Sequence, residues 1–585
     1  MRGTRCTTKL PPVPVQQFNN STTQRYPTMK KILNIIISAL LLTTAQLNAN
    51  NDAIIFTAMQ QEMERNMEGL KLPNMPAPFF ISYIIAEGET IDITATMGAV
   101  VTSLHRPKVR SSSVRVLTES PELTHDARFT NQGATAGVAL ANDVNQIRRN
   151  LWASTDAEYK RGLAALSTKR NILRRVTLPE ADRKLKDFNI PEPVKKRIEA
   201  KGFAPFQQEE LNEQMRNLSA IFREFPRIHS SQVLLQARQN IFYIVNSQGT
   251  EIRKPLSNVA IRIRAEIRAD DGANYVDQHI IVAENINKLP SSAEMERIVR
   301  AFADKLQQLA EAPLVAEFYS GPVLFEGDAA AEIFLDNLIT PSGVLFSRRP
   351  IVAGNPVFTP NRPIGRKVID TRLTVINHTQ KTTHRGMNLV GAYAVDADGV
   401  IPAPRQVLVE RGLLRQILNT SIPNQQADRS HGNFRLGVNP GVISTQIQPA
   451  VLEITSSQTL TPARLRQRLL STARSEGLDY AYIVRQISST PKIYRVDVRT
   501  GRETLMRSPD IERITISRLQ RFDAVSNQEF VANRMFGIRA ADGSRSVPMP
   551  ISIICPGAIL LQDVEVRRQT ANMGTLPPVS NPTER

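Results

Sequence analysis

The segment GPVLFEGDAAAEIFLDNL, residues Gly321 to Leu338, constrains the fold of this 585-residue chain more than any other. Its apolar residues Val323–Phe325 predict a short buried strand, and Gly327 predicts a tight turn after it. A helix is expected next, capped by Asp328, because a carboxylate there can accept from the free N–H groups of the first turn. Three alanines keep this helix slim enough to lie close to a sheet. The other apolar positions give it one apolar face: Ile333, Phe334 and Leu338.

Apolar spacing and capping residues predict helices at several other places. Ile55 and three methionines at four-residue intervals form one stripe over residues 55–67, which packs in a core. Thr155 and Ser291 each stand three residues before a glutamate, the pattern of a capping box. Gln207–Arg223 has apolar residues on one helical face, and Thr461 followed by proline is expected to begin a helix as well.

The N-terminal half is also expected to contain strands. Phe79–Ala86 and Ile91–Thr94 are predicted as two strands joined by a turn at residues 87–89. Val259–Ile267 alternates apolar residues with arginine and glutamate, as a strand with one buried and one solvated face does. The simplest interpretation of these arginines is a solvated sheet face, and the alternative is a platform for acidic ligands. Helices and strands in this mixture predict an α+β fold.

The N-terminus has the pattern of an export signal. A short basic stretch begins at Met29, the apolar run Ile32–Leu42 follows, and small residues end at Ala49. Residues 1–28 are therefore expected to be an upstream extension, and residues 29–49 a signal peptide too short to span a membrane. Residues 1–49 carry six basic and no acidic residues, so their removal lowers the formal net charge from +18 to +12. A soluble periplasmic or extracellular protein, with no integral membrane segment after cleavage, is the expectation.

Cysteine content and charge narrow the possible functions. Cys6 lies in the segment expected to be removed, so Cys555 alone remains and no intramolecular disulfide is possible. The positive charge favours anionic partners. No basic patch interleaved with aromatic residues is present, so nucleic-acid binding is not expected. The sequence also has no Gly-x-Ser-x-Gly elbow and no phosphate-binding glycine loop.

Several segments in the C-terminal half resemble the TldD/PmbA family, the metallopeptidase-related "modulators of DNA gyrase". They occur in the family's order, from about Tyr319 to Arg568: GPVLFEGDAAAEIF, the Asp396–Gly399 stretch, the loop Ser430–Asn433 and the segment Ile553–Leu561. The resemblance implies a two-domain architecture with mixed or antiparallel sheets and packed helices. The expected divisions are residues 50–312 for the N-terminal domain, 313–570 for the C-terminal domain and 571–585 for a flexible tail.

The resemblance also bears on the active site. The catalytic branch of the family carries His-Glu-x-x-x-His at this point, with zinc on the two histidines and the glutamate as general base. This chain has Glu326, Gly327 and Ala331 at those three places, so it resembles the PmbA-type branch that lacks the metal motif. Cys555 corresponds to the family's third ligand. No cofactor is therefore expected, with zinc as the alternative.

Two interpretations of the remaining candidate residues stay open. In the first, Glu326, His431 and Cys555 form a rearranged metal site, with Glu326 as the catalytic candidate. In the second, which is favoured, Glu326 solvates the turn, His431 is a loop residue and Cys555 is a buried core thiol. The substrate cleft is expected near Gly327, Asp328, Gly432 and Asn433.

The function implied by the resemblance is proteolysis of unfolded peptides. Because the metal motif is absent, the chain is expected to be the non-catalytic partner of a zinc-bearing TldD-like paralogue, or to pair with itself as a dimer. Two alternatives remain: a self-sufficient metallopeptidase with a rearranged metal site, and a non-enzymatic protein that binds acidic peptides or envelope polymers.

Overall fold

The computed structural model describes most of the chain after residue 50: residues 51–125, 134–339, 343–346, 351–352, 355–356, 363–439, 442–537 and 548–569. The segments expected to be an upstream extension, a signal peptide and a C-terminal tail lie outside these residues. The chain divides into a short unit up to Ile54 and a second unit from Ile55 onward. Everything that follows concerns the second unit.

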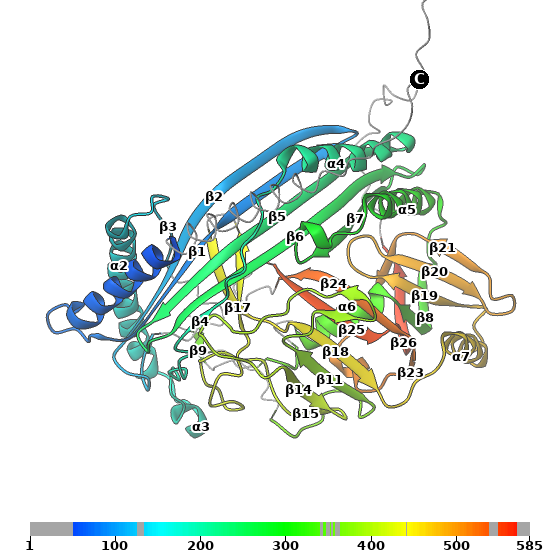
Figure 1. Cartoon of the computed structure of the whole chain (residues 1–585). Coiled ribbons are helices and arrows are strands. Elements are labelled where there is room, and N and C mark those ends of the chain that lie inside the picture. Colours follow the sequence, from blue (N-terminus) through cyan, green and yellow to red (C-terminus); the bar gives the residue numbers. More distant parts are fainter. Residues whose placement is uncertain are drawn as a thin grey trace, which may run out of the picture. The chain divides into compact units, whose positions relative to one another are not determined.

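A seven-stranded, mostly antiparallel sheet forms the centre of the N-terminal half, residues 55–312 (Figure 1). Its order is β3-β2-β1-β5-β6-β4, with β7 also paired to β6. The strands are β1 (Pro78–Thr96), β2 (Ala99–Thr118), β3 (Ala134–Gly137), β4 (Arg197–Ile198), β5 (Ile228–Asn246), β6 (Glu251–Arg268) and β7 (Asn274–Ala283). The predicted alternation over Val259–Ile267 is confirmed, because its apolar residues are buried and the intervening residues are not.

Helices cover one face of this sheet. Besides the helix at residues 51–69, this half contains α2 (Val144–Leu173), α3 (Glu180–Arg183), α4 (Gln208–Ala220) and α5 (Ser292–Glu311), with 3-10 turns η1 (Ile221–Glu224) and η2 (Ile286–Lys288). Leu211 and Met215 of α4, with Val299 of α5, pack on Ile93 and Ile261 of the sheet. Residues 55–69 are helical as predicted, and Ser291 caps α5 by accepting from the Glu294 N–H at 3.3 Å.

Two predictions in this half were wrong. Residues 87–89 form no turn but continue β1, because other strands satisfy both carboxylates: Arg110 donates to Glu87 at 2.6 Å, and Gln239 donates to Glu89 at 2.6 Å. Thr155 does not begin a helix. It lies inside α2 and donates to the Leu151 carbonyl at 2.6 Å, while Asp143 caps the helix.

The C-terminal half, residues 313–569, contains two larger sheets. A six-stranded sheet has the order β15-β14-β11-β18-β25-β24, and a seven-stranded sheet has the order β21-β20-β19-β8-β26-β22 with β23 beside β26. The strands of the first are β11 (Leu373–His378), β14 (Arg405–Glu410), β15 (Leu413–Leu414), β18 (Val451–Ser456), β24 (Glu529–Phe536) and β25 (Met549–Pro556). Those of the second are β8 (Phe318–Glu326), β19 (Tyr480–Gln486), β20 (Lys492–Asp497), β21 (Glu503–Met506), β22 (Pro509–Ile511), β23 (Ala524–Val525) and β26 (Ala558–Arg568).

Short hairpins and helices complete this half. The hairpins are β9 (Ile351–Val352) with β10 (Asn355–Pro356), β12 (Thr383–His384) with β13 (Met387–Asn388), and β16 (Phe434–Asn439) with β17 (Val442–Ile447). The helices are α6 (Asp328–Leu338), α7 (Pro462–Ser475) and α8 (Ile516–Leu519). Thr461 caps α7 as predicted, by accepting from the Arg464 N–H at 3.3 Å.

The central segment folds as the sequence predicts. β8 pairs with β19 on one side and β26 on the other, the chain turns at Gly327, and α6 follows. Phe334 and Leu338 of α6 pack in one large core with Val323 of β8 and Ile553 of β25, so the helix joins the two sheets. The expected α+β architecture with mixed and antiparallel sheets is confirmed. No helix in the described residues is long and apolar enough to cross a membrane.

Candidate functional site

The junction of β8 and α6 is the first part of the candidate site. Gly327 has φ of 58° and ψ of −119°, a backbone conformation that favours glycine over any residue with a Cβ. Its N–H donates to the Gly557 carbonyl at 2.9 Å, which fixes the turn to β26. Four residues further on, Ala331 is fully buried in the core. Position 327 therefore lacks the conformation for the family's general-base side chain, and position 331 lacks the space for a metal-binding one.

Glu326, the weak catalytic candidate, is held in an ion pair. Arg485 of β19 donates from Nε to the Glu326 carboxylate at 3.0 Å, and its Nη2 lies 3.0 Å from the Glu503 carboxylate. The same guanidinium lies 4.4 Å above the ring of Tyr494. Glu326 is thus one of two carboxylates paired with a positioned arginine, and its side chain is occupied by that contact.

Asp328 does not cap α6, contrary to the sequence-based expectation. No side-chain cap bond forms at this helix, and the Asp328 carboxylate instead forms an ion pair with Arg534 of β24. Both side chains are partly buried, with exposed fractions of 36% and 27%. Burial lowers the pKa of Arg534. The ion pair places a cation beside the N-terminus of α6 and ties this helix to the edge of the six-stranded sheet.

Cys555 is a core residue, as the favoured interpretation holds. It lies on β25 opposite Phe530 of β24, is completely buried and belongs to the main hydrophobic core of this half. Burial raises the pKa of its thiol well above the ordinary range. Because the thiolate is the form that binds metals, a neutral buried thiol is a poor ligand.

The loop that contains His431, Gly432 and Asn433 forms a separate structural cluster. His431 Nδ1 lies 3.1 Å from the Ile417 carbonyl, and burial lowers the pKa of this imidazole. Gly432 has φ of 74° and packs on Pro402, while the buried Asn433 donates to the Gln406 side chain at 2.9 Å. These polar groups are used to hold the loop.

The structure does not bring Glu326, His431 and Cys555 together. In the part of the chain that the structure describes, no group of three or more His, Cys, Asp or Glu side chains is placed to hold a metal ion. The donor set also fails on chemistry, since Glu326 is paired with Arg485 and Cys555 is a neutral buried thiol. These residues do not fit the zinc of the catalytic branch.

Residues from the N-terminal half complete the candidate site, and sequence reasoning missed them. Asp277 of β7 forms an ion pair with Lys492 of β20 and accepts from Gln486 at 3.3 Å. His279 follows two residues later on β7, and its pKa is lowered by burial and by the charge of Arg534. No local pattern could have revealed these contacts, because their partners lie more than 200 positions apart in the sequence, 215 in the case of Asp277 and Lys492.

Two terminal strands meet at this place. Within the described part of the chain, β7 pairs with β6 alone, and β24 is the last strand of its sheet. Side chains of the C-terminal half reach the outer backbone edge of β7 at two points: Thr490 donates to the Val276 carbonyl at 2.6 Å, and Asn533 donates to the Val282 carbonyl at 3.4 Å. Since outward groups recur at every second residue, those of Gln278 and Ile280 between these points face outward too. Among the described residues, this outer edge of β7 has no partner strand.

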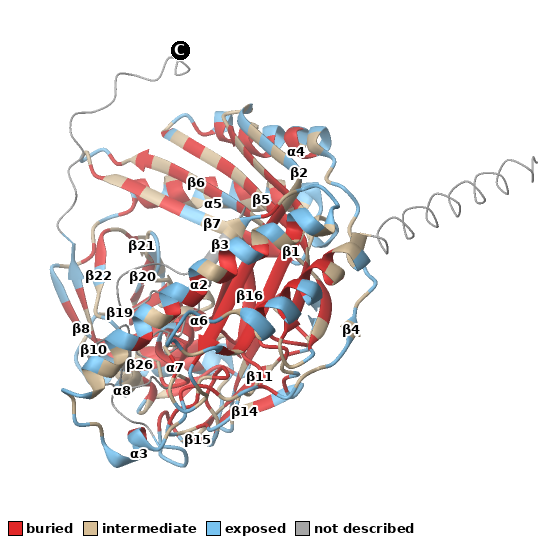
Figure 2. Cartoon of the chain, turned by 90° about the vertical axis from the view of Figure 1, so that its left-hand side faces the viewer, coloured by how far each residue is buried: buried red, intermediate tan, exposed pale blue. Residues whose placement is uncertain are grey.

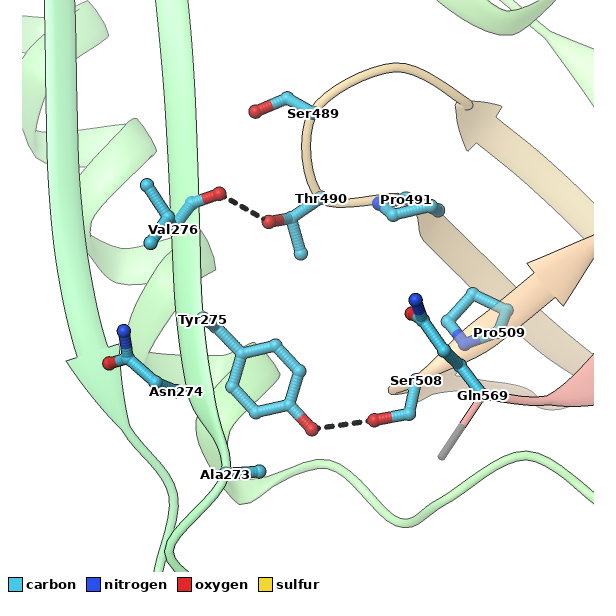
Figure 3. A pocket seen from close by; sticks show the side chains of 10 residues that line it. All are labelled: Ala273, Asn274, Tyr275, Val276, Ser489, Thr490, Pro491, Ser508, Pro509 and Gln569. Atoms are coloured by element: carbon cyan, nitrogen blue, oxygen red, sulfur yellow. Dashed lines mark hydrogen bonds between the residues drawn. The ribbon is translucent and has the colours of Figure 1, made fainter. Parts of the chain in front are cut away.

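A small polar cavity of about 140 Å³ lies at the start of β7 (Figure 3). Tyr275 points toward Ser508, with 2.7 Å between their hydroxyl oxygens, and Arg507 donates to the Tyr275 hydroxyl at 3.0 Å. The volume corresponds to roughly five water molecules. This cavity is too small for a peptide segment, and its hydrogen bonds join the two halves of the chain.

Comparison with known proteins gives a likeness in structure alone. No protein-family model and no curated protein matches the sequence. Among solved structures, TldE from Thermococcus kodakarensis matches with a TM-score of 0.51 and 12% identity, over 87% of this chain and 99% of that one. A putative modulator of DNA gyrase from Thermotoga maritima matches with a TM-score of 0.52 and 12% identity, over 83% of this chain and 96% of that one. The chain therefore has the fold of TldE and of this putative gyrase modulator, which confirms the TldD/PmbA-like fold expected from its sequence.

Proposed function

We propose that this protein is an exported, metal-free member of the TldD/PmbA family that takes part in proteolysis of unfolded peptides as the non-catalytic partner of a zinc-bearing paralogue. The fold shared with TldE supports the family assignment. The N-terminal sequence pattern supports export, because a basic start, an apolar run and a small-residue end form a signal peptide.

The ion pair between Asp328 and Arg534 carries the non-catalytic part of the proposal. It lies at the start of α6, within the stretch where the catalytic branch has its zinc motif. Arg534 is partly buried there and lowers the pKa of His279 through its charge. The Asp328 carboxylate is occupied by this guanidinium and is not free to bind a cation, which disfavours zinc at this place. Independently, the buried Ala331 leaves no space for a metal-binding side chain, and the backbone conformation of Gly327 disfavours a general base there.

Peptide binding is supported by the strand edge of β7. An extended segment can add to an exposed edge through its own main-chain groups, which binds unfolded chains with little regard to sequence. The edge between Val276 and Val282 lies beside Asp277, His279 and Arg534. Asp277 is buried in its ion pair with Lys492, so the partly exposed Arg534 is the charged group placed to contact such a segment.

The test is to purify the chain from residue 50 onward without a metal-binding tag, alone and after co-expression with a paralogue that carries His-Glu-x-x-x-His. Zinc content is measured by plasma mass spectrometry, and hydrolysis with a fluorescently labelled unfolded casein. We expect no stoichiometric zinc and no hydrolysis for the isolated chain, co-purification with the paralogue, and zinc-dependent hydrolysis by the complex.

A self-sufficient peptidase would give a different result. One zinc per isolated chain, with hydrolysis that a chelator abolishes, would establish a rearranged site and overturn the non-catalytic role. Failure to recover any complex with the paralogue, together with a stable self-dimer in analytical ultracentrifugation, would instead replace the heteromeric partner with a second copy of this chain.

A further inference from the structure

The second face of the N-terminal sheet is left partly uncovered by the described elements. Toward one end of the strands, Ile84 and Phe242 on this face pack against Val395 and Phe434 of the C-terminal half. Toward the other end, the same face is only partly buried, whereas the opposite face lies under α4 and α5. In Figure 2 the strands of this region carry alternating buried and intermediate bands.

The residues of this uncovered part can be placed by the strand register. One row across five strands reads Thr102, Thr94, Leu234, Arg262 and Ile280. The neighbouring row toward the buried end reads Leu104, Asp92, Gln236, Ala260 and Val282. We call the part of the face spanned by these rows, with Arg106, Arg238, Arg264, Glu266 and Arg268 on the same side, the arginine face.

Charge on the arginine face is unbalanced. In this set of residues, five arginines stand against two carboxylates, so positive charges outnumber negative ones by three. Asp92 is bound by the buried Arg238 at 2.6 Å, and Glu266 by Arg264 at 2.6 Å. Arg106 and Arg262 are exposed and form no ion pair within the residues that the structure describes. The two free guanidinium groups are therefore available to a ligand.

Apolar side chains lie between these cations. Leu104 is 46% exposed, and Leu234 and Ile280 are partly exposed beside Arg262. A purely polyanionic ligand such as an acidic polysaccharide would leave these side chains without a partner. A polypeptide offers both carboxylates and apolar side chains, so it matches the composition of the face.

We propose that the arginine face binds acidic polypeptide segments, with Arg106 and Arg262 as the carboxylate-binding residues and Leu234 and Ile280 as the apolar contacts. The arginine face lies on the side of the N-terminal sheet opposite to α4 and α5. Binding there needs no paralogue, so the inference does not rest on the proposed partner role. It extends the proposed function by naming the class of polypeptide that this chain would bind, because the face ends on β7, the strand whose edge meets β24.

The test uses the whole chain from residue 50 onward and fluorescein-labelled peptides of alternating glutamate and valine, or lysine and valine, in fluorescence anisotropy. We expect binding of the glutamate peptide only, with an affinity that falls when salt is raised to about 0.3 M. Arg106→Glu and Arg262→Glu should each weaken binding about tenfold, since charge reversal replaces attraction by repulsion. The matched control Arg521→Glu changes the net charge equally at an exposed position of the C-terminal half and should leave binding unchanged.

Leu234→Ser tests the apolar part of the face. It should weaken binding of the glutamate–valine peptide severalfold. Any binding of polygalacturonate, a polyanion without apolar side chains, should stay unchanged. The proposal would be overturned if Arg521→Glu lowered the peptide affinity as much as Arg106→Glu and Arg262→Glu do. It would also be overturned if both peptides bound equally well, or if polygalacturonate bound and the glutamate peptide did not. Circular dichroism and thermal melting of each variant show that the fold is retained, and none of these outcomes depends on zinc or on a paralogue.

Discussion

The guanidinium of Arg534 on β24 forms an ion pair with the carboxylate of Asp328, 206 positions earlier in the chain at the start of α6. This contact joins the central strand–turn–helix unit to the edge of the neighbouring sheet. It also puts a positive charge beside the backbone segment in which the catalytic branch of the TldD/PmbA family carries its metal ligands. Several of the consequences can be measured without knowledge of the substrate.

Removal of one partner should destabilise the protein. In Arg534→Ala the Asp328 carboxylate stays partly buried without its cation, and we expect the free energy of unfolding to fall by about 1–3 kcal/mol. Urea unfolding followed by circular dichroism measures this change. The exposed Arg521→Ala, for which the structure records no ion pair, should change stability by less than about 0.5 kcal/mol. A loss no larger than in this control would show that the ion pair contributes little.

Restoring one motif residue should not restore a metal site. Ala331 is fully buried in the main core, so Ala331→His forces a larger polar side chain into a packed region. We expect a loss of about 2–3 kcal/mol and no gain in zinc content. Thermal melting and plasma mass spectrometry with and without added zinc are the measurements. A variant that becomes more stable in the presence of zinc would contradict this account of the site.

Gly88 lies in the middle of β1, where the sequence predicted a turn. A Cβ at this position would lie 2.1 Å from the Gln239 carbonyl oxygen of β5, so Gly88→Ala must push two backbones apart. We expect a loss of about 2 kcal/mol or more, or failure to fold. Gly202→Ala is the matched control, because no heavy atom lies within 4 Å of the added Cβ there. Similar melting temperatures for the two variants would refute the close approach.

The sequence predicted several features that depend on neighbouring residues, although the caps expected at Thr155 and Asp328 were wrong. The Ser291 cap of α5, the alternation along β6 and the strand–turn–helix unit at Gly327 are local patterns, and the structure has all three. The wrong turn at residues 87–89 has a physical reason. Glu87 and Glu89 are polar in sequence, but Arg110 and Gln239 from adjacent strands satisfy them inside the sheet.

The candidate site could be predicted only in part, for the same reason. The absence of the metal motif at Glu326, Gly327 and Ala331 is visible in the sequence. The arginines that neutralise Glu326 and Asp328 are not, because Arg485 and Arg534 come from strands 159 and 206 positions away. Pairings over such separations are set by the tertiary fold and leave no periodic signal.

Stability at acidic pH should depend on Glu453. His378 Nε2 and Lys381 Nζ lie 2.7 and 3.0 Å from its carboxylate, and these two neighbours lower its pKa to about 2. Because the carboxyl pKa is lower in the folded state than in the unfolded state, where it is near 4.5, the ionised carboxylate stabilises the fold fully above that pH. This contribution disappears as the pH falls from 4.5 toward 2. We expect it to be about 1 kcal/mol after solvent screening. The measurement is urea unfolding of the wild type and of Glu453→Gln at pH 5 and pH 3. The wild type should have the higher free energy of unfolding at pH 5, and this difference should shrink at pH 3.

Lys254 should make stability depend on pH in the alkaline range, where stability again rises with pH. It is buried between β6 and the C-terminal half, where it donates to the Val395 carbonyl at 2.8 Å and lies 5.4 Å from the centre of the Tyr393 ring. Burial lowers its pKa to about 8, with the nearby Arg435 acting in the same direction.

Below this pH the folded state must hold a buried cation, while the unfolded chain holds the same charge in water. As the pH rises from about 8 to 10.5 the folded state loses this proton before the unfolded state does, so the free energy of unfolding should increase. The increase should be on the order of 2–3 kcal/mol relative to Lys254→Met, whose side chain does not titrate. Urea unfolding of both proteins across this range isolates the lysine from other titrating groups, and parallel pH profiles would show that Lys254 stays charged in the folded protein.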